Sequence, residues 1–299
     1  MAQVVRKSEK ISKIIIHAFF IILSFVFIIP IWTLFAISIT SDADIINYGY
    51  QLWPKAIDWG AYEYIFTSAS DILSAYKVTI IITVVGTVLS TVIGAMCAYT
   101  ISRQDFAYKS RVTFYMFFTM LFGGGMVPSY ILMTQYLHVQ NTYWALILPG
   151  MISVWNIFIM RTFFQQIPSS IIESATIDGA SEMKIFISII VPLSTPALAT
   201  IGLLQMLGYW NAWTPAMLYI TDQKLYPLQY LLQTMLRNMQ EIMKNIELTG
   251  NTNMIDLSSL PMESMRMAMA VLAVGPILLV FPFFQKYFVQ GLTVGSVKG

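Results

Sequence analysis

The sequence predicts an all-α, polytopic membrane protein with six transmembrane helices. Of its 299 residues, 57% are hydrophobic and only 11% are charged, whereas a soluble domain carries about 25% charged residues. Residues 112–160 and 185–221 contain no Asp, Glu, Lys or Arg at all. Because backbone polar groups in lipid must be satisfied within their own segment, uncharged segments of this length predict membrane-spanning helices.

The boundaries of the expected spans follow from where charged residues interrupt the apolar sequence. The spans cover approximately residues 14–39, 78–102, 112–134, 143–160, 186–213 and 267–284. The first segment is too long for the hydrophobic part of a signal peptide and lacks a clear small-residue cleavage site. We therefore interpret 1–299 as one transmembrane domain with a cytoplasmic loop at about 161–185 and an external loop at about 221–266.

The Lys and Arg residues between the spans predict the orientation of the protein. One side has eleven: Arg6, Lys7, Lys10, Lys13, Arg103, Lys109, Arg111, Arg161, Lys184, Lys286 and Lys298. The other side has six: Lys55, Lys77, Lys224, Arg237, Lys244 and Arg266. Cytoplasmic loops carry the excess of positive charge, so both termini are expected in the cytoplasm.

The third span contains Gly123, Gly124 and Gly125, followed by Pro128. Glycine and proline interrupt helices, so this span is expected to break or kink. A phosphate-binding loop is not indicated, because no Gly-Lys-Ser/Thr sequence follows the glycines. A hinge or a close helix crossing is the favoured interpretation.

A compact polar segment, residues 173–184, separates the fourth and fifth spans and predicts two short helices joined at a glycine. Pro168 ends the preceding segment, and Ser170 with Glu173 fits a capping box for the first helix. Gly179 can adopt the left-handed conformation that ends this helix, and Ser181 can cap the second one. An ordinary loop between two spans is the alternative interpretation.

The spacing Glu173-x-Ala175-x3-Gly179-x9-Ile189-x2-Pro192 resembles the EAA loop of ABC-importer permeases, and Asp178-Gly179-Ala180 matches its sugar-importer form. Ser174 and Val191 stand where this family usually has alanine and leucine. Further likeness to the MalG-like branch of carbohydrate permeases lies in Leu52-Trp53-Pro54-Lys55 with Tyr62, in residues 141–146 and in the C-terminal tail, residues 285–299. Within that branch, the chain looks most similar to permeases for oligosaccharides and uronate-containing glycans.

This resemblance implies an ABC type I importer permease fold in a bacterial cell membrane. It implies four kinds of partner: a second related permease, two ATPase subunits, an extracytoplasmic sugar-binding protein and membrane lipid, with no nucleic acid. ATP and Mg would be bound by the ATPase subunits, and this chain would hold no cofactor. The residues expected to couple to the ATPase are Glu173, Ser174, Ala175, Asp178, Gly179 and Ala180.

The outer end of the fifth span carries a polar and aromatic group, namely Tyr209, Trp210, Asn211 and Trp213. Aromatic faces stack on sugar rings and an asparagine hydrogen-bonds hydroxyl groups, so these residues are a substrate-pathway hypothesis. Anchoring at the membrane interface is the alternative, because aromatic residues are enriched there.

The external loop at about 221–266 contains apolar residues at helical spacing, which predicts an amphipathic helix. They are Leu228, Leu231, Leu232, Met235, Leu236 and Met239. Residues 245–259 are polar and are expected to be irregular. In the maltose-type family this loop meets the external binding protein, and the resemblance implies the same contact here.

The chemistry-bearing residues of the chain exclude several other functions. Neither histidine sits in a metal-ligand motif, so no metal site is expected. The expected spans contain no Asp or Glu, which argues against proton- or sodium-coupled carriers because such carriers use intramembrane carboxylates. The alternative from another class is a membrane-embedded enzyme acting on lipid-linked sugars, with Asp42, Asp44, Asp58 and Glu63 as its acidic candidates.

Overall fold

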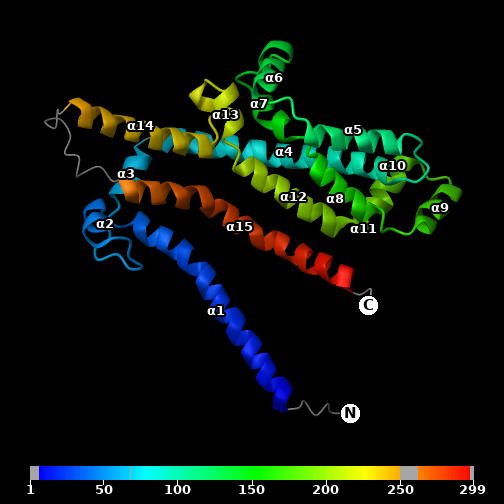
Figure 1. Cartoon of the computed structure of the whole chain (residues 1–299), viewed down its shortest axis with the longest axis horizontal. Coiled ribbons are helices and arrows are strands. Elements are labelled where there is room, and N and C mark those ends of the chain that lie inside the picture. Colours follow the sequence, from blue (N-terminus) through cyan, green and yellow to red (C-terminus); the bar gives the residue numbers. More distant parts are fainter. Residues whose placement is uncertain (1–6, 68, 250–261, 297–299) are drawn as a thin grey trace. The chain divides into compact units, whose positions relative to one another are not determined.

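A computed structural model describes residues 7–67, 69–249 and 262–296, which are helical throughout with short connections and contain no strand (Figure 1). The chain divides into two compact units, residues 1–69 with 235–275 and residues 70–234 with 276–299. The interpretation of 1–299 as a single domain stays a prediction. Two of the residues that predicted the orientation, Arg6 and Lys298, lie outside the described residues. So do residues 297–299 of the C-terminal tail.

The first unit begins with α1 (Lys7–Ser38), whose segment Ser12–Ser38 has a mean hydropathy of 2.9 and no buried residue in its most apolar window. Next come α2 (Asp42–Tyr48) and α3 (Gly60–Phe66). The unit also contains the end of α14 (Leu228–Thr249) and the beginning of α15 (Met262–Ser296). The Asp42 carboxylate accepts hydrogen bonds from the Glu263 and Ser264 amides at 2.9 and 3.0 Å, so the first residue of α2 caps the start of α15.

The second unit is organised along α4 (Ala69–Ser102), an unbroken 34-residue helix. The third and fourth spans consist of shorter elements, namely α5 (Lys109–Leu121), α6 (Met126–Ile131), η1 (Leu132–Tyr136), α7 (Tyr143–Ile147), η2 (Leu148–Gly150) and α8 (Val154–Phe164). They are followed by α9 (Ser169–Ile177), α10 (Glu182–Ile185), η3 (Phe186–Ile190), α11 (Val191–Leu193), α12 (Thr195–Trp210), α13 (Thr214–Tyr219) and η4 (Gln223–Leu225).

The six expected spans are confirmed when each bent helix pair counts as one span. Ser12–Ser38, Ala69–Ser102 and Met262–Val280 are long and apolar enough to cross a membrane as single helices. The other three spans are bent pairs, Lys109–Leu121 with Met126–Tyr136 at 110°, Tyr143–Gly150 with Val154–Phe164 at 53°, and Glu182–Leu193 with Thr195–Trp210 at 84°.

The bends have local causes. The break expected in the third span is confirmed, because α5 ends before Gly123 and Gly125 has a φ of +85°. The fourth and fifth spans are bent as well, at breaks that the sequence analysis did not predict. In the fourth span, Pro149 lies in the 3-10 turn at the bend. In the fifth span, Pro196 lies in the first turn of α12, directly after the bend. Neither proline has a backbone N–H to donate to a helical hydrogen bond.

Two hydrophobic clusters hold the second unit together at different places along α4. The hairpin cluster consists of Ala95, Ala98, Tyr99, Ile101, Ile157, Met160, Phe164, Ile185, Phe186, Ile190 and Ile201. The α7 cluster consists of Val78, Ile82, Met133, Ala145, Leu146, Ile147, Ala216, Tyr219 and Ile220. The C-terminal half of α4 therefore packs in one cluster and its N-terminal half in the other.

The amphipathic helix expected in the external loop is confirmed as α14, which starts at Leu228. Residues 245–249 were expected to be irregular, but they continue this helix, so that part of the prediction is wrong. Helical hydrogen bonding extends past the last residues of the apolar stripe. The rest of the polar stretch, residues 250–259, lies outside the described residues.

Candidate functional site

The polar segment between the fourth and fifth spans forms a helical hairpin, defined here as α9, the turn at Gly179, and α10. Gly179 has a φ of +77°. Its amide donates to Thr176 O and the Ala180 amide donates to Ala175 O, both at 3.0 Å, and this pair of bonds is the Schellman helix ending. The expected turn at Gly179 is therefore confirmed, and a side chain there would be strained by the left-handed backbone even though the space around it is open.

The helix caps confirm one expectation and overturn another. The Ser181 hydroxyl accepts a hydrogen bond from the Lys184 amide at 3.4 Å, so Ser181 caps α10 as expected. The capping box with Ser170 is wrong, because α9 already begins at Ser169 and Pro168 is its cap residue without a side-chain bond. Pro168 has a φ of −57° and a ψ of 130°, so its own backbone is not helical and the helix starts at the next residue.

The hairpin has an inner and an outer face. Ile172, Ala175 and Ala180 pack against the hairpin cluster. Glu173, Ser174 and Asp178 are exposed, together with Ile177, which is 86% exposed. The two carboxylates, at Glu173 and Asp178, make no hydrogen bond or ion pair with other residues that the structure describes. The outer face therefore presents acidic groups and an isoleucine that the chain itself leaves uncovered.

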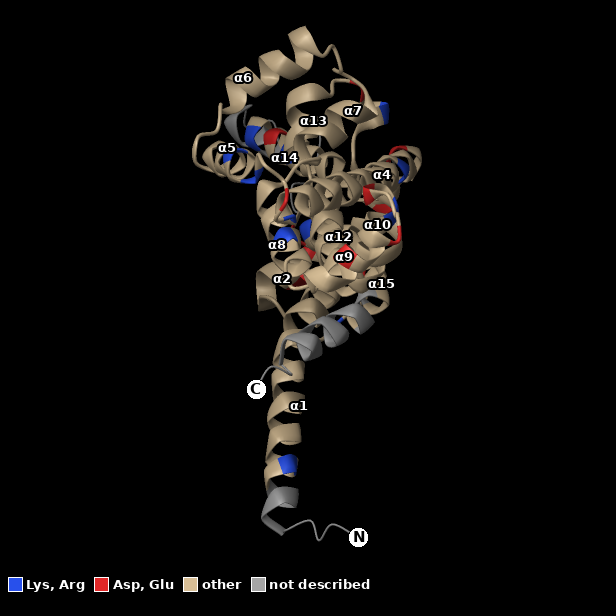
Figure 2. Ribbon diagram, turned by 90° about the vertical axis from the view of Figure 1, so that its right-hand side faces the viewer, with Lys and Arg blue, Asp and Glu red and all other residues tan. Residues whose placement is uncertain are grey.

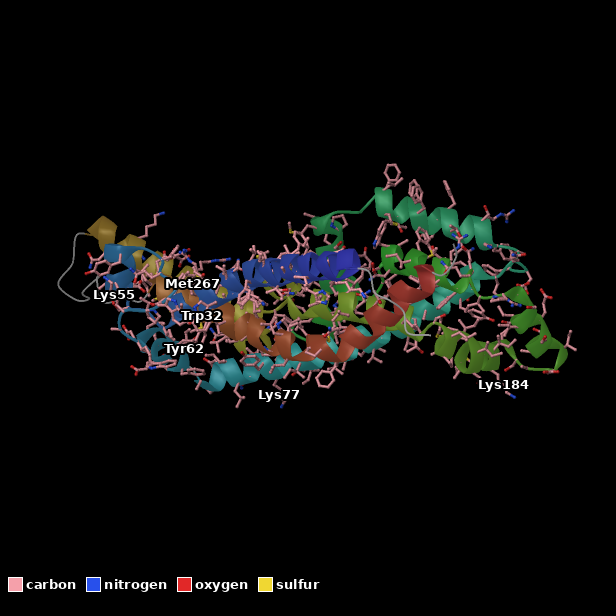
Figure 3. All side chains as sticks on the ribbon, turned by 90° about the horizontal axis from the view of Figure 1, so that it is seen from below. Trp32, Lys55, Tyr62, Lys77, Lys184 and Met267 are labelled. Carbon is pink, nitrogen blue, oxygen red and sulfur yellow. The ribbon has the colours of Figure 1, made fainter. Side chains whose placement is uncertain are left out.

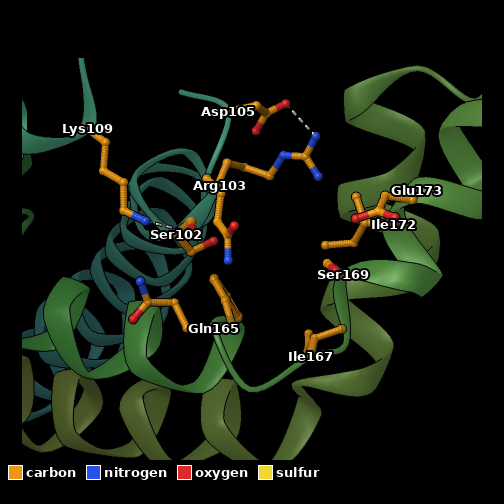
Figure 4. A pocket seen from close by; sticks show the side chains of 11 residues that line it. Ser102, Arg103, Asp105, Lys109, Gln165, Ile167, Ser169, Ile172 and Glu173 are labelled. Carbon is orange, nitrogen blue, oxygen red and sulfur yellow. Dashed lines mark hydrogen bonds and ion pairs between the residues drawn. The ribbon is translucent and has the colours of Figure 1, made fainter. Parts of the chain in front are cut away.

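A recess of about 330 Å³ opens beside the hairpin, between α9, the end of α8 and the turn that joins α4 to α5 (Figure 4). The Arg103 guanidinium lines it and donates to Asp105 Oδ2 at 2.8 Å. Glu173 lines the same recess from α9. Lys109 lines the recess as well, so it holds two basic side chains beside the Glu173 carboxylate.

Three residues of this region have a role that sequence reasoning missed. The Tyr99 hydroxyl donates to Glu182 Oε2 at 2.5 Å, and Arg103 donates to Glu182 Oε1 at 3.1 Å. Arg103 entered the sequence argument only through its charge, and Glu182 only as part of a polar segment. Tyr99 carried no signal, because nothing in a single sequence links two residues that are 83 positions apart.

Charged residues are sparse along α1 and occur on both helices of the hairpin (Figure 2). Lys184 on α10 extends away from the helix (Figure 3) and is exposed. No group of three or more His, Cys, Asp or Glu residues that could hold a metal ion occurs within residues 7–67, 69–249 and 262–296. The hairpin therefore presents exposed charged side chains on both of its helices.

The four residues of the substrate-pathway hypothesis differ in exposure and in their hydrogen bonds. Tyr209 is only 3% exposed, and its hydroxyl donates to Ile147 O at 2.9 Å. A Cβ atom on Gly86 would lie 2.6 Å from Tyr209 Cζ, and one on Gly150 would lie 3.1 Å from its ring. The Tyr209 ring is therefore held between two glycines, and its hydroxyl is already engaged.

The other three residues lie nearby with different exposure. Trp210 is buried and Trp213 is half-buried, whereas Asn211 is exposed. Asn211 Nδ2 donates to Leu207 O at 2.9 Å, and its Oδ1 accepts from Gln229 Nε2 at 3.3 Å. A cavity of about 170 Å³ lies beside Tyr209. Contact of any of these residues with a substrate stays a prediction.

Comparisons with known proteins give one consistent result. The profile of the family described as "Binding-protein-dependent transport system inner membrane component" matches residues 1–294. The chain is 37% identical over 292 residues, 97% of this chain and 99% of the relative, to the polygalacturonan/rhamnogalacturonan transport system permease protein YtcP of Bacillus subtilis (strain 168). It is 29% identical over 300 residues, 98% of this chain and 99% of the relative, to the arabinooligosaccharides transport system permease protein AraQ of Halalkalibacterium halodurans.

A solved structure agrees with these relatives. The chain is similar, with a TM-score of 0.75 and 29% identity over 94% of this chain and 98% of that chain, to a chain in the crystal structure of a bacterial ABC transporter involved in the import of the acidic polysaccharide alginate. The expected type I importer fold is therefore confirmed. The alternative of an enzyme acting on lipid-linked sugars receives no support from any of these proteins.

Proposed function

Because the chain belongs to the family of inner membrane components of binding-protein-dependent transport systems, it is a permease subunit of an ABC importer, and we propose that its cargo is an acidic oligosaccharide. The names of similar proteins support an oligosaccharide, since they mention polygalacturonan and rhamnogalacturonan, arabinooligosaccharides and alginate. Two of these three names refer to polymers with carboxylate-bearing sugars. A uronate-containing oligosaccharide is therefore the first cargo to test.

The working assembly that we propose contains this chain, a second related permease, two ATPase subunits and an extracytoplasmic binding protein that delivers the cargo. ATP and Mg would be bound on the ATPase subunits. In this arrangement the spans of the two permeases form the path of the cargo across the membrane. ATP-driven closure of the ATPase dimer moves the hairpin of this chain and the corresponding segment of the second permease. The result is a rigid-body switch between outward-facing and inward-facing states.

The uncovered outer face of the hairpin is the observation that carries the coupling role. Glu173 lines the recess and makes no ion pair with the described residues, while the Gly179 turn and the packed inner face hold the hairpin in a fixed shape. We assign Glu173 to an ion pair with an ATPase subunit. Ser174, Ile177 and Asp178 would complete that contact, while the small side chains of Ala175 and Ala180 allow the hairpin to pack closely.

The proposed site implies an orientation in the bacterial cell membrane. The hairpin and both termini would face the cytoplasm, where the ATPase subunits bind ATP. The excess of Lys and Arg on this side of the expected spans supports that orientation. α14 would then lie on the external side, where a binding protein can reach it.

A tagged pull-down from membranes tests the assembly and the site together. Wild-type protein should recover a second permease and an ATPase, whereas Gly179→Asp should lose the ATPase and keep the second permease. The matched control is Gly49→Asp, because Gly49 also has a positive φ of 71° and no neighbouring atom within 4 Å of an added Cβ. Absence of an ATPase from the wild-type sample would overturn the assembly, and full recovery with Gly179→Asp would overturn the coupling site.

The cargo is tested by uptake in cells that depend on this permease. Labelled oligogalacturonides should enter, and their entry should stop when the permease is deleted. Neutral arabino-oligosaccharides of equal length are the control. Uptake of the neutral sugars alone would contradict an acidic cargo and leave the importer assignment intact.

A further inference from the structure

α4 differs from the other spans of the second unit because it is unbroken. The remaining spans there are bent pairs with angles of 110°, 53° and 84°, whereas α4 runs from Ala69 to Ser102 as one helix. A movement applied to one end of a bent span can be absorbed at its break. A continuous helix passes such a movement to its other end.

The cytoplasmic end of α4 is clamped to the hairpin through Glu182. Glu182 is the first residue of α10, directly after the cap residue Ser181. One of its carboxylate oxygens accepts from the Tyr99 hydroxyl and the other from Arg103 Nη2. Tyr99 lies in the last turn of α4, and Arg103 directly follows that helix. The centroid of the Tyr99 ring also lies 5.4 Å from that of Phe186, the residue after α10. We call these contacts the Glu182 clamp.

The Glu182 clamp is well placed to transmit force. Tyr99 is 7% exposed and the Arg103 side chain is 18% exposed, whereas the Glu182 side chain that both contact is 59% exposed. Arg103 is also held from its other side by Asp105 at 2.8 Å. Charge-assisted hydrogen bonds are short and directional, so two of them on one carboxylate fix the orientation of α10 on α4.

The opposite end of α4 is attached to the start of α14. The Thr79 side chain is fully buried, and its hydroxyl oxygen accepts a hydrogen bond from the Leu228 amide at 2.8 Å. Leu228 is the first residue of α14, where a helix leaves backbone amides without partners in its own turns. Thr79 and Tyr99 are twenty positions apart on α4, which places these two attachments about 30 Å apart.

We propose that α4 is the rigid element that carries movement of the hairpin to the start of α14, with Glu182, Tyr99 and Arg103 as positioning residues at one end and Thr79 at the other. This inference rests on the coupling role proposed for the hairpin. It predicts that the ATPase subunits and the external face of the permease communicate through one helix. Changes at either end of α4 should then uncouple ATP hydrolysis from transport without dissolving the complex.

The first experiment compares Tyr99→Phe and Glu182→Gln with wild type in the complete transporter in proteoliposomes. The measurements are uptake, ATP hydrolysis with and without the binding protein, and recovery of the ATPase in a pull-down. We expect uptake per ATP hydrolysed to fall roughly threefold to thirtyfold, with the ATPase still bound. Tyr108→Phe is the matched control, because it removes an exposed tyrosine hydroxyl near the same end of α4 that makes no hydrogen bond with the described residues.

The second experiment changes the other end of α4. Thr79→Val keeps the shape of the side chain and removes the acceptor for the Leu228 amide. We expect a weaker stimulation of ATP hydrolysis by the binding protein. The control is Thr100→Val on the same helix, because Thr100 is exposed and its hydroxyl donates to the backbone oxygen of Met96 within its own helix.

The two ends together give the decisive comparison. If both ends act through the same helix, uptake per ATP hydrolysed in the Thr79→Val/Tyr99→Phe double variant should be no lower than in the poorer single variant. Unchanged coupling in all variants, or fully additive losses, would overturn the role of α4 and leave the proposed function standing. If Glu182→Gln does not assemble, Tyr99→Phe still decides, because it removes a single oxygen atom. A wild-type complex without ATPase would instead overturn the proposed function itself.

Discussion

The hairpin at residues 169–185 and the Tyr209 segment at residues 209–213 were both predicted as functional from sequence, and their side chains are used in opposite ways. On the hairpin, Glu173 and Asp178 are exposed and make no polar contact with the described part of the chain. In the Tyr209 segment, the Tyr209 ring lies between Gly86 and Gly150, and its hydroxyl bonds a backbone oxygen. The first region is open to a partner, while the tyrosine of the second stabilises its own helices.

This difference separates two kinds of sequence signal. The hairpin was identified by a fixed spacing of several residue types, and each type has a separate physical role in turn, packing or charge. The Tyr209 segment was identified only because aromatic and amide side chains suit sugars. Such residues also suit helix packing, because a buried tyrosine needs a partner for its hydroxyl.

The largest effect is expected at Gly86. The Cβ atom of Gly86→Ala would lie 2.6 Å from Tyr209 Cζ, and the ring cannot retreat because Gly150 lies close to it as well. Overpacking of this kind costs roughly 1–3 kcal/mol or more, so the yield of folded permease and its thermal midpoint should drop sharply. Gly208→Ala on α12 is the control, since no atom lies within 4 Å of its added Cβ. Equal loss in both variants would contradict the packing role of Tyr209.

The next effect is expected for Glu173→Lys on the hairpin. This change reverses the charge that we propose to face an ATPase subunit, and it leaves the packed inner face untouched. Uptake should fall roughly tenfold or more, because a partner cation would meet a like charge, while the amount of folded permease stays unchanged. Glu173→Gln, which removes the charge without reversing it, should lie between this variant and wild type. Normal uptake with Glu173→Lys would show that the outer face has no ionic contact.

A smaller effect is expected for Tyr209→Phe. The change removes one hydrogen bond to Ile147 O and leaves the ring in place, which costs about 0.5–1.5 kcal/mol of stability. The KM for the transported sugar should stay at the wild-type value. A raised KM with unchanged thermal stability would contradict the packing interpretation and favour direct contact with the cargo.

The smallest effect is expected for Asn211→Ala. Asn211 is exposed, and its side-chain bonds to Leu207 O and Gln229 lie at the protein surface. Surface substitutions of this kind usually change stability by no more than about 0.5 kcal/mol. If the substrate-pathway prediction holds for this residue, KM should rise while stability does not change. An unchanged KM would remove Asn211 from the pathway.

Local rules account for most of what was predicted correctly. Helix breaks need only Gly or Pro in the chain, and the break at Gly123–Gly125 was expected for that reason. The Gly179 turn and the Ser181 cap likewise depend on a few neighbouring residues. The Ser170 cap failed because Pro168 competes for the same helix start, which is a choice between two local signals of similar strength.

Contacts between distant positions could not be predicted. The bond between Tyr99 and Glu182 joins residues 83 positions apart, and the bond between Leu228 and Thr79 joins residues 149 positions apart. A single sequence shows that these donors and acceptors exist, but it does not show which donor pairs with which acceptor. The Glu182 clamp and the second attachment of α4 are therefore visible only in the folded chain.

By itself, the sequence determined the membrane class, the six spans and the shape of the hairpin, because these depend on hydropathy, on chain length and on the backbone preferences of glycine and proline. Folding in three dimensions settled which polar side chains are engaged and which stay open. It packed the Tyr209 ring and its hydroxyl between helices, left Glu173 uncovered, and joined both ends of α4 to other elements. The physical reason is that a hydrogen bond requires two groups to meet in space, and their meeting is set by the packing of whole helices.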